Sequence, residues 1–380
     1  MIAKLIKKLP IVLTMLIIGL PAKSFSCTTL CLKNDNQIVY GRNFDFPFGA
    51  GFIATNRKNL SKIAFLSPNE KPVSWVSKYG SITFNQVGME FPYEGMNEKG
   101  LVIAQLFMGG TKYPLADDRK AINCLQWIQY HLDISSSVSD VINSDSLIRI
   151  SDNIPIGIHF LVCDKQGNIA TIEFINGKMV CHTSKTLPIP LLQNQTYDSS
   201  FDYLKNFSGF GGNQTIPWKN INDYQWSDDS ITLCQNKSFV VAANRMKNYD
   251  HSKTLIENTF DVLGTVTIHN ATQWSSVFDI TNMKIHFKNY RRNEVMTIDF
   301  KNFTFENTSK SKILDIQTSS ASNILNQFVD YSTELNGKYA FESAKLMINS
   351  NFIPFKIPEE VIEMQVKYPE TIKAIDKQND

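Results

Sequence analysis

The sequence lacks the excess of positive charge that a nucleic-acid-binding protein needs. Its 38 basic and 36 acidic residues leave a formal charge of +2 over 380 residues. The first 26 residues hold four lysines and no acidic residue, so the rest of the chain carries a formal charge of −2. A chain this close to neutral offers no broad positive field to a polyanion. We therefore expect no nucleic-acid partner.

The chain has only six cysteines, and their spacing excludes two common uses of this residue. None lies in a CxxC motif or beside a pair of histidines, so the sequence predicts neither a zinc site nor a disulfide scaffold. The histidines are scattered, and none forms with Cys27 the pattern of a cysteine–histidine dyad. The sequence leaves open whether any disulfide joins Cys31, Cys124, Cys163, Cys181 and Cys234.

A hydrophobic run long enough to span a bilayer is also missing. The apolar stretch 9–20 is interrupted and shorter than the roughly 20 residues that a membrane helix needs. Three lysines precede it, and the small residues Ser24 and Ser26 follow it, which is typical of a secretory signal peptide cut before Cys27. We expect a secreted or periplasmic bacterial protein with no membrane anchor after cleavage. A retained anchor and a lipid on Cys27 are the alternatives.

The start of the remaining chain predicts a β-hairpin. The segment CTTLCLK is rich in apolar and β-branched residues, Asn34-Asp35-Asn36 supplies turn chemistry, and QIVYGRNF resumes the strand pattern. If Asn34 and Asp35 form the turn, Cys27 lies opposite Arg42. Other turn choices shift this pairing by a residue or two.

Further along the chain, strand patterns fall into two groups around a helical middle. Helical spacing covers 118–149 and 323–350, and the polar stretch 193–231 reads as a long loop with short helices beside a binding site. The Ser/Thr-rich stretch 309–322 marks a boundary between a domain at 27–308 and a helical C-terminal extension at 309–380. The other predicted strands are 81–87 and 100–107 as a second hairpin, 158–164, 169–175, 179–183, 237–246, 264–270, 274–281 and 283–289. This pattern predicts an α+β fold with two β-layers and helices outside them.

A cysteine at a mature N-terminus can act as both nucleophile and base. Its thiol attacks, and its own α-amine, with a pKa near ~8 in peptides, can carry the proton. Arg42 would favour the thiolate, and Asp45 could orient the α-ammonium by a charge-assisted hydrogen bond. The alternative interpretation makes Cys27 a buried strand residue and Arg42–Asp45 a surface ion pair.

Five separated segments resemble the choloylglycine hydrolase family, which includes bile salt hydrolases, penicillin V acylases and acyl-homoserine-lactone acylases. They are CTTLCLKNDNQIVYGRNFDFPFG, YEGMNEKGLVIAQL, LVCDKQGNIATIEFINGKMV, SFVVAANRM and QWSSVFDITNMKIHF, in this order over residues 27–290. The resemblance implies an N-terminal-nucleophile hydrolase fold, which is an αββα sandwich of two mainly antiparallel sheets with helices outside. It also implies hydrolysis of a linear amide without a metal or cofactor, by an enzyme that forms tetramers or dimers.

The same resemblance assigns roles to individual residues. Cys27 matches the nucleophile, Arg42 and Asp45 match a conserved pair in GRNFD, and Arg245 in AANRM matches an arginine that closes the charged cluster. Asn194 matches a side-chain donor of the oxyanion hole, although Gln193 and Thr196 depart from the usual neighbours of that asparagine.

A main-chain N–H after the GMNEKG segment, at Phe107 or its neighbour Met108, would be the second oxyanion donor. Asn97 within that segment is expected to be a structural turn residue. The apolar residues expected to line an acyl pocket are Phe46, Phe48, Phe107, Met108 and Trp226.

These observations predict a secreted cysteine amidohydrolase acting on an N-acyl small molecule of the penicillin V or acyl-homoserine-lactone type. A conjugated bile salt is the alternative substrate. From other classes, a catalytically inactive ligand-binding homologue and a self-processing structural protein are the alternatives.

Overall fold

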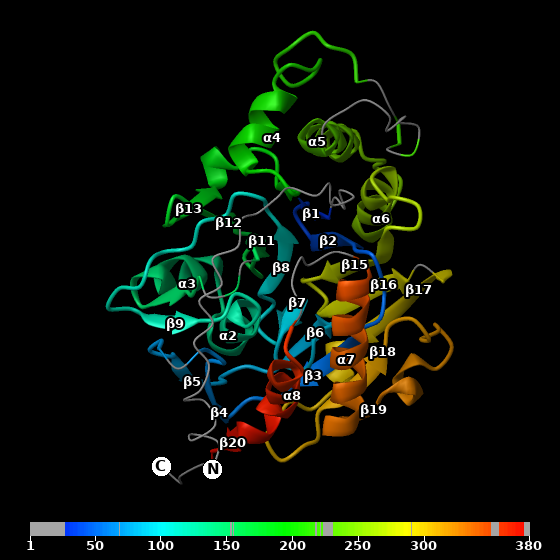
Figure 1. The fold of residues 1–380 in the computed structure, drawn as a ribbon. Helices are drawn as coiled ribbons and strands as arrows, with labels where there is room; N and C mark the ends of the chain where they lie inside the picture. The colour runs from blue at the N-terminus through cyan, green and yellow to red at the C-terminus, as the bar shows by residue number, and fades with distance from the viewer. Residues whose placement is uncertain are drawn as a thin grey trace.

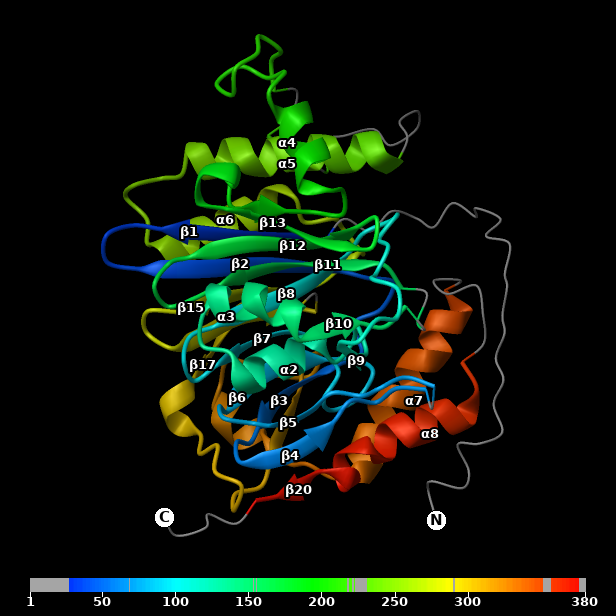
Figure 2. The same cartoon turned by 90° about the vertical axis from the view of Figure 1, so that its left-hand side faces the viewer.

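The computed structural model describes residues 27–67, 69–152, 154, 156–216, 219–220, 222, 231–289, 291–350 and 357–375. They form two stacked β-sheets with helices on both outer faces (Figures 1 and 2). The predicted signal peptide and Trp226 lie outside the described residues. Among the described residues, no helix combines the length and apolar character required to cross a membrane.

The smaller of the two stacked sheets has six strands, and all of its pairings are antiparallel. In spatial order they are β14 (Leu191–Leu192), β1 (Thr28–Lys33), β2 (Ile38–Asp45), β15 (Thr272–Asp279), β16 (Lys284–Asn289) and β17 (Arg292–Asp299). The segment that begins with Cys27 therefore enters the sheet next to its edge strand.

The larger sheet has nine strands and is also antiparallel throughout. In spatial order they are β13 (Lys178–Thr183), β12 (Ile169–Ile175), β11 (Ile158–Cys163), β8 (Val102–Phe107), β7 (Pro92–Asn97), β6 (Ser81–Asn85), β3 (Phe52–Asn56), β18 (Lys312–Asp315) and β19 (Val329–Asp330). Alternate side chains from the facing surfaces of the two sheets form the main apolar core.

Two pairs of helices cover the outer faces. Helices α2 (Trp127–Ile134) and α3 (Val138–Asn143) pack on the nine-stranded sheet, while α5 (Ile231–Lys247) and α6 (Leu255–Thr265) pack on the six-stranded sheet (Figure 2). Capping boxes start α3 and α6, at Ser137 with Asp140 and at Thr254 with Glu257. At Gly41 of β2 a Cβ atom would overlap Thr259 of α6, so this glycine permits the close packing of helix on strand.

Shorter elements complete the fold. The short strands are β9 (Lys120–Ile122) and β10 (Ile148–Ile150), which pair in parallel, and β20 (Lys373–Ala374), β4 (Leu60–Ile63) and β5 (Ser74–Val76), which form a third sheet. Helix α4 spans Tyr197–Leu204, and the 3₁₀ turns are Ser144–Ser146, Ser184–Thr186, Phe300–Asn302, Ile324–Gln327 and Tyr368–Thr371.

The first hairpin forms as predicted, with a register shifted by two residues. Thr28 pairs with Asn43 and Thr29 with Arg42. The cause lies in the turn, where the Asn34 side-chain oxygen accepts hydrogen bonds from the main-chain N–H groups of Asn36 and Gln37. This Asx turn keeps Asn34 at the base of the loop and moves the two turn residues one position along the chain.

Two of the predicted strands and one predicted strand pairing are wrong. Residues 237–246 lie within α5, because a short apolar run fits a buried helix as well as a strand. Residues 264–270 follow the end of α6 and form no strand. Strand 81–85 pairs with β7 instead of with 102–107, so the second hairpin is a three-stranded meander.

The C-terminal part of the chain packs on the nine-stranded sheet. The predicted division at residue 308 falls just before β18, which pairs with β3 inside that sheet. Helices α7 (Thr333–Asn349) and α8 (Glu359–Lys367) lie beside its edge (Figure 1). The Asn336 amide oxygen of α7 accepts from the Met89 N–H, and the Ser343 hydroxyl donates to the Gln86 carbonyl.

Candidate active site

Cys27 lies at the entrance of β1 with only 6% of its surface exposed. Its Sγ donates a long hydrogen bond of 3.5 Å to the Asp45 carbonyl oxygen. Burial raises the pKa of the thiol to about 11, and the Arg42 guanidinium beside it opposes that rise. With residue 27 amide-linked to residue 26, the thiol is therefore protonated at neutral pH, and a proton acceptor is needed before it can attack.

The Arg42 guanidinium lies between β7 and β8 of the nine-stranded sheet, where these two strands separate. Its Nη1 donates to the Tyr93 carbonyl at 2.6 Å, and its Nη2 donates to the Gln105 carbonyl at 2.8 Å. The β7–β8 pairing ends at Glu94 and Ala104, so these two carbonyls belong to the region where the strands separate. Arg42 thus binds carbonyls that no longer pair between β7 and β8, and these hydrogen bonds fix the guanidinium next to Cys27.

Glu94 is a buried carboxylate behind Arg42 that sequence reasoning did not single out. Its Oε2 lies 3.5 Å from Arg42 Nη1, Trp274 Nε1 donates to its Oε1 at 2.8 Å, and the Ser276 hydroxyl donates to its Oε2 at 2.9 Å. Burial raises the pKa of Glu94, while Arg42 and these hydrogen bonds lower it. The only sequence signal was its place in the YEGMNEKG segment.

Asp45 has one carboxylate oxygen with a partner and one without. The Thr272 hydroxyl donates to Oδ1, whereas Oδ2 is buried and has no hydrogen-bond partner among the described residues. Burial raises the pKa of the Asp45 carboxyl to about 7, although the Thr272 hydrogen bond and Arg42 lower it. A buried carboxylate oxygen without a partner costs free energy of folding. A hydrogen-bond donor placed beside Oδ2 would remove that cost.

Asn194 lies in a bend two residues beyond β14, the edge strand that pairs with the beginning of β1. Leu192 of β14 pairs with Thr29, so the chain from Leu192 to Asn194 leaves the sheet near the end of β1 at which Cys27 lies. Its side chain is 3% exposed, and its Oδ1 has no partner among the described residues. The neighbouring Gln193 is fixed in place, because its Nε2 donates to the hydroxyls of Thr28 and Ser238.

Phe107 is the last residue of β8, two residues beyond Gln105, whose carbonyl binds Arg42. The next residue, Met108, donates its N–H to the Gly157 carbonyl. Because main-chain N–H groups alternate in direction along an antiparallel strand, the Phe107 N–H points away from β11. It faces the side on which β7 has separated from β8, which is the side filled by Arg42.

The apolar side chains expected in the pocket differ in how far they are exposed to solvent. Phe46 is buried, stacks on Phe44 with ring centroids 5.2 Å apart, and meets Phe48 edge-to-face at 4.9 Å. Met108 is buried, whereas Phe107 is 48% exposed. Of the four members that the structure describes, Phe107 is thus the one available to a ligand, while Phe46, Phe48 and Met108 are buried.

Arg245 is not brought to Cys27. It lies in the last turn of α5, where its Nη2 is 2.8 Å from Asp261 of α6 and its Nη1 donates to the Asn248 carbonyl. The resemblance of AANRM to the family motif assigned Arg245 to the charged cluster, but the helix directs Arg245 to α6 instead. Glu94 is the residue that accompanies Arg42 in the structure.

Asn97 has the structural place expected of it. Its side-chain oxygen accepts from the N–H groups of Lys99 and Leu101, and its Nδ2 donates to the Leu132 and Ser135 carbonyls. Elsewhere, the described part of the chain contains no cluster of three or more His, Cys, Asp or Glu side chains suited to a metal ion.

Comparison with known proteins points to one family. The model of linear amide C–N hydrolases, choloylglycine hydrolase family, matches residues 27–314. Penicillin V acylase from Pectobacterium atrosepticum is 23% identical over 262 residues, which are 61% of this chain and 69% of that protein. Bile salt hydrolase/transferase from Lactiplantibacillus plantarum is 30% identical over 187 residues, which are 47% of this chain and 54% of that protein.

Solved structures share the fold. Penicillin V acylase from Agrobacterium tumefaciens superposes with a TM-score of 0.64 at 21% identity, over 80% of this chain and 98% of that one. A variant of the conjugated bile acid hydrolase from Clostridium perfringens gives 0.60 at 20% identity, over 76% of this chain and 97% of that one. The predicted N-terminal-nucleophile hydrolase sandwich is therefore confirmed.

Proposed function

Because the chain belongs to the choloylglycine hydrolase family of linear amide C–N hydrolases, we propose that it is an exported amidohydrolase whose nucleophile is Cys27, freed by removal of residues 1–26. The observation that carries this proposal is the buried Oδ2 of Asp45 beside Cys27, which has no hydrogen-bond partner within the described part of the chain. Cleavage before Cys27 creates an α-ammonium group at this place. That group supplies the donor that Asp45 lacks in the uncleaved chain.

In the proposed reaction, the Cys27 thiol passes its proton to its own α-amine while Sγ attacks the amide carbonyl carbon. The Arg42 charge next to Sγ favours the thiolate against the cost of burial. The α-amine then gives the proton to the leaving nitrogen, and the C–N bond breaks to leave a thioester. Water, deprotonated by the same amine, releases the acyl group and regenerates the thiol.

The developing oxyanion would receive two hydrogen bonds. Asn194, in the bend that follows β14, offers its amide N–H, and Phe107 offers a main-chain N–H directed toward Arg42. Such donors act mainly on the tetrahedral state, because the negative charge on the oxygen grows as that state forms.

For the substrate we propose an N-acyl amide of the penicillin V or acyl-homoserine-lactone type. The half-exposed Phe107 ring next to its own N–H would pack on an aryl or aliphatic acyl group near the carbonyl. A matched relative that is a penicillin V acylase supports this choice. A conjugated bile salt is the second candidate, since the other matched relative is a bile salt hydrolase/transferase.

The test is a panel of penicillin V, long-chain acyl-homoserine lactones, glycocholate and taurocholate, with the released amine as the readout. We expect turnover of one or more of the first two and loss of that turnover, by about 10³-fold or more, in Cys27→Ala. Cys181→Ala, at a half-buried cysteine outside the site, is the matched control and should keep wild-type turnover. Full activity of purified Cys27→Ala would refute the proposal, and ligand binding without turnover in the wild type would favour an inactive homologue.

A further inference from the structure

Two buried titratable side chains near the site have no role in the proposed reaction. His159 of β11 and Glu173 of β12 are both fully buried. The β11–β12 register pairs Phe160 with Ile172, so His159 and Glu173 are direct cross-strand neighbours. His159 shares a face of its strand with Cys163, whose Sγ lies 3.5 Å from that of Cys31 on β1. The pair therefore faces the six-stranded sheet, in the layer that holds Cys27.

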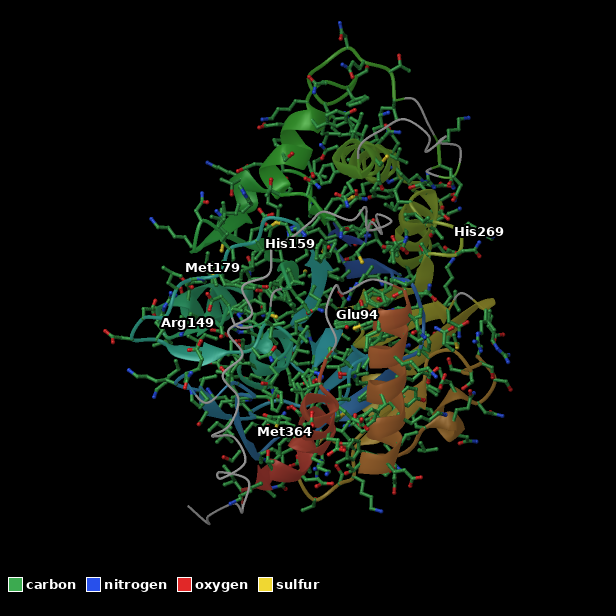
Figure 3. All side chains as sticks on the ribbon, in the orientation of Figure 1. Glu94, Arg149, His159, Met179, His269 and Met364 are labelled. Carbon is green, nitrogen blue, oxygen red and sulfur yellow. The ribbon has the colours of Figure 1, made fainter. Side chains whose placement is uncertain are left out.

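One oxygen of Glu173 connects the nine-stranded sheet to helix α4. Its Oε1 lies within hydrogen-bond distance of His159 Nδ1, at 3.1 Å, and accepts from the main-chain N–H of Tyr197 at 3.0 Å. Tyr197 is the first residue of α4, and Figure 3 shows His159 in the middle of the molecule on the side of this helix. Glu173 thus binds the beginning of α4 from the opposite sheet.

One other titratable side chain, His182, approaches this pair. His182 Nε2 lies 3.9 Å from the second Glu173 oxygen and 3.6 Å from Asp198 Oδ1. The His182 ring also packs against the Tyr197 ring, with centroids 4.9 Å apart. These distances exceed that of a hydrogen bond, so the short contacts of Glu173 are those with His159 and Tyr197.

The segment held in this way contains Asn194. On one side of Asn194, Leu192 pairs with Thr29 of β1, and on the other, three residues on, the Tyr197 N–H is bound by Glu173. The Asn194 Oδ1 has no partner among the described residues, so its own amide oxygen does not fix its orientation. The Leu192 pairing, the two hydrogen bonds of Gln193 and the Glu173–Tyr197 bond therefore hold the main chain on both sides of Asn194.

We propose that Glu173, oriented by His159, is the positioning residue that holds Asn194 as an oxyanion donor. This inference rests on the proposed function, because it assumes that Asn194 acts on the tetrahedral state. Glu173 itself touches no reacting atom. Its loss should therefore lower kcat through Asn194 and leave KM nearly unchanged.

A double-mutant cycle tests the coupling. We expect Glu173→Leu to lower kcat by about 10- to 100-fold, less than the about 10²- to 10³-fold cost of losing a donor outright. In an Asn194→Ala background the same change should cost less than about threefold, since the donor is already gone. Glu173→Gln keeps an oxygen for both hydrogen bonds and should restore most of kcat. Equal losses in the two backgrounds would overturn the inference.

A second measurement does not depend on turnover. Hydrogen–deuterium exchange of the segment 193–199 should be faster in Glu173→Leu than in the wild type, and close to the wild type in Glu173→Gln. Glu173→Asp, whose shorter side chain reaches Tyr197 less well, provides the same test if Glu173→Leu does not fold. Unchanged exchange and kcat in the folded variants would overturn the inference even if the proposed function holds. Faster exchange would support the anchor even if the wild type proves inactive.

The control loosens the same helix without touching Glu173. The Thr196 hydroxyl caps α4 by accepting from the Ser199 N–H, and Thr196→Ala removes this bond. We expect this variant to keep kcat within about threefold of the wild type, because the Tyr197 anchor stays in place. A loss of kcat equal to that of Glu173→Leu would mean that any weakening of α4 disturbs Asn194, which contradicts a specific role for Glu173.

Discussion

Two buried clusters of charge lie on different parts of the fold, and they differ in how completely their polar atoms are satisfied. In the first, Lys62 of β4 lies 2.6 Å from Glu90 and 2.8 Å from Asp133 of α2, and Trp75 donates to the same Asp133 oxygen. None of the buried nitrogen and oxygen atoms of these three charged side chains lacks a partner.

The second cluster surrounds Cys27 and leaves several atoms without partners. They are Arg42 Nε, Asp45 Oδ2 and Asn194 Oδ1, all buried and unbonded among the described residues. A complete network of buried charges is explained by the fold that it stabilises, whereas unsatisfied groups gathered at one place indicate a site where a ligand or a new chain end binds. We therefore expect mutations in the first cluster to lower stability and mutations in the second cluster to lower activity.

Removing the cation of the first cluster should give the largest effect, on stability alone. Lys62→Met leaves Glu90 and Asp133 as buried like charges, and we expect a loss of about 3–5 kcal/mol in the free energy of unfolding. The kcat of the folded fraction should stay at the wild-type value. Urea denaturation and kinetics on the same sample measure both, and a drop in kcat without a loss of stability would remove the distinction between the clusters.

Asp45 should make the second cluster sensitive to pH. With Cys27 still amide-linked, the folded pKa is about 7 and the ordinary value is 3.8, so the folded state binds the proton more tightly. The contribution of the protonated Asp45 carboxyl to the free energy of unfolding is complete below pH 4 and is lost as pH rises through 7. The upper limit of this loss is about 4 kcal/mol.

Urea denaturation between pH 4 and 8 measures this loss. Asp45→Asn should abolish the decline, and a chain that begins at Cys27 should show a smaller one, because its α-ammonium can pair with Oδ2. Stability that rises with pH over this range in the uncleaved chain would contradict the assignment.

Asn194→Ala should affect catalysis and spare stability. Removing one oxyanion donor typically costs 10²- to 10³-fold in kcat, or about 3 kcal/mol of transition-state stabilisation, and we expect a loss of that size with little change in KM. The thermal unfolding midpoint checks that the fold is intact. A rise in KM at unchanged kcat would instead make Asn194 a substrate-binding residue.

The smallest effect is expected at Arg245, which belongs to neither cluster. Its ion pair with Asp261 is about 30% exposed on both sides, so Arg245→Ala should cost less than about 1 kcal/mol of stability. Turnover should stay within about twofold of the wild type. A large loss of kcat would return Arg245 to the active site, against its position in α5.

Sequence reasoning was most successful where local chemistry decides the structure. Turn residues between two strand-like segments predicted the first hairpin, and the shift of its register came from one Asn34 side chain bonding to its own turn. It failed at α5, since the apolar run in SFVVAANRM fits a buried helix as well as a strand. Arg245, which the resemblance assigned to the charged cluster, pairs with Asp261 instead.

Residues that act across the space between the sheets could not be found in this way. Glu94 reaches Arg42, Trp274 and Ser276 from other strands, and Glu173 reaches Tyr197, 24 positions away along the chain. Nothing in the local sequence distinguishes these carboxylates from exposed ones, because their function depends on the stacking of two sheets. Cys27 and Asp45 were accessible from the predicted cleavage site and the first hairpin, whereas Asn194 was accessible only through resemblance to a family.

The central claim is that Cys27 is the first residue of the active protein. Intact-mass measurement and N-terminal sequencing of the exported, active protein test this most directly. The account predicts a chain that begins at Cys27 with a free α-amine and an unmodified thiol. An active chain that begins upstream, or one whose Cys27 α-amine is blocked, would contradict it, because no amine would then be left to accept the thiol proton.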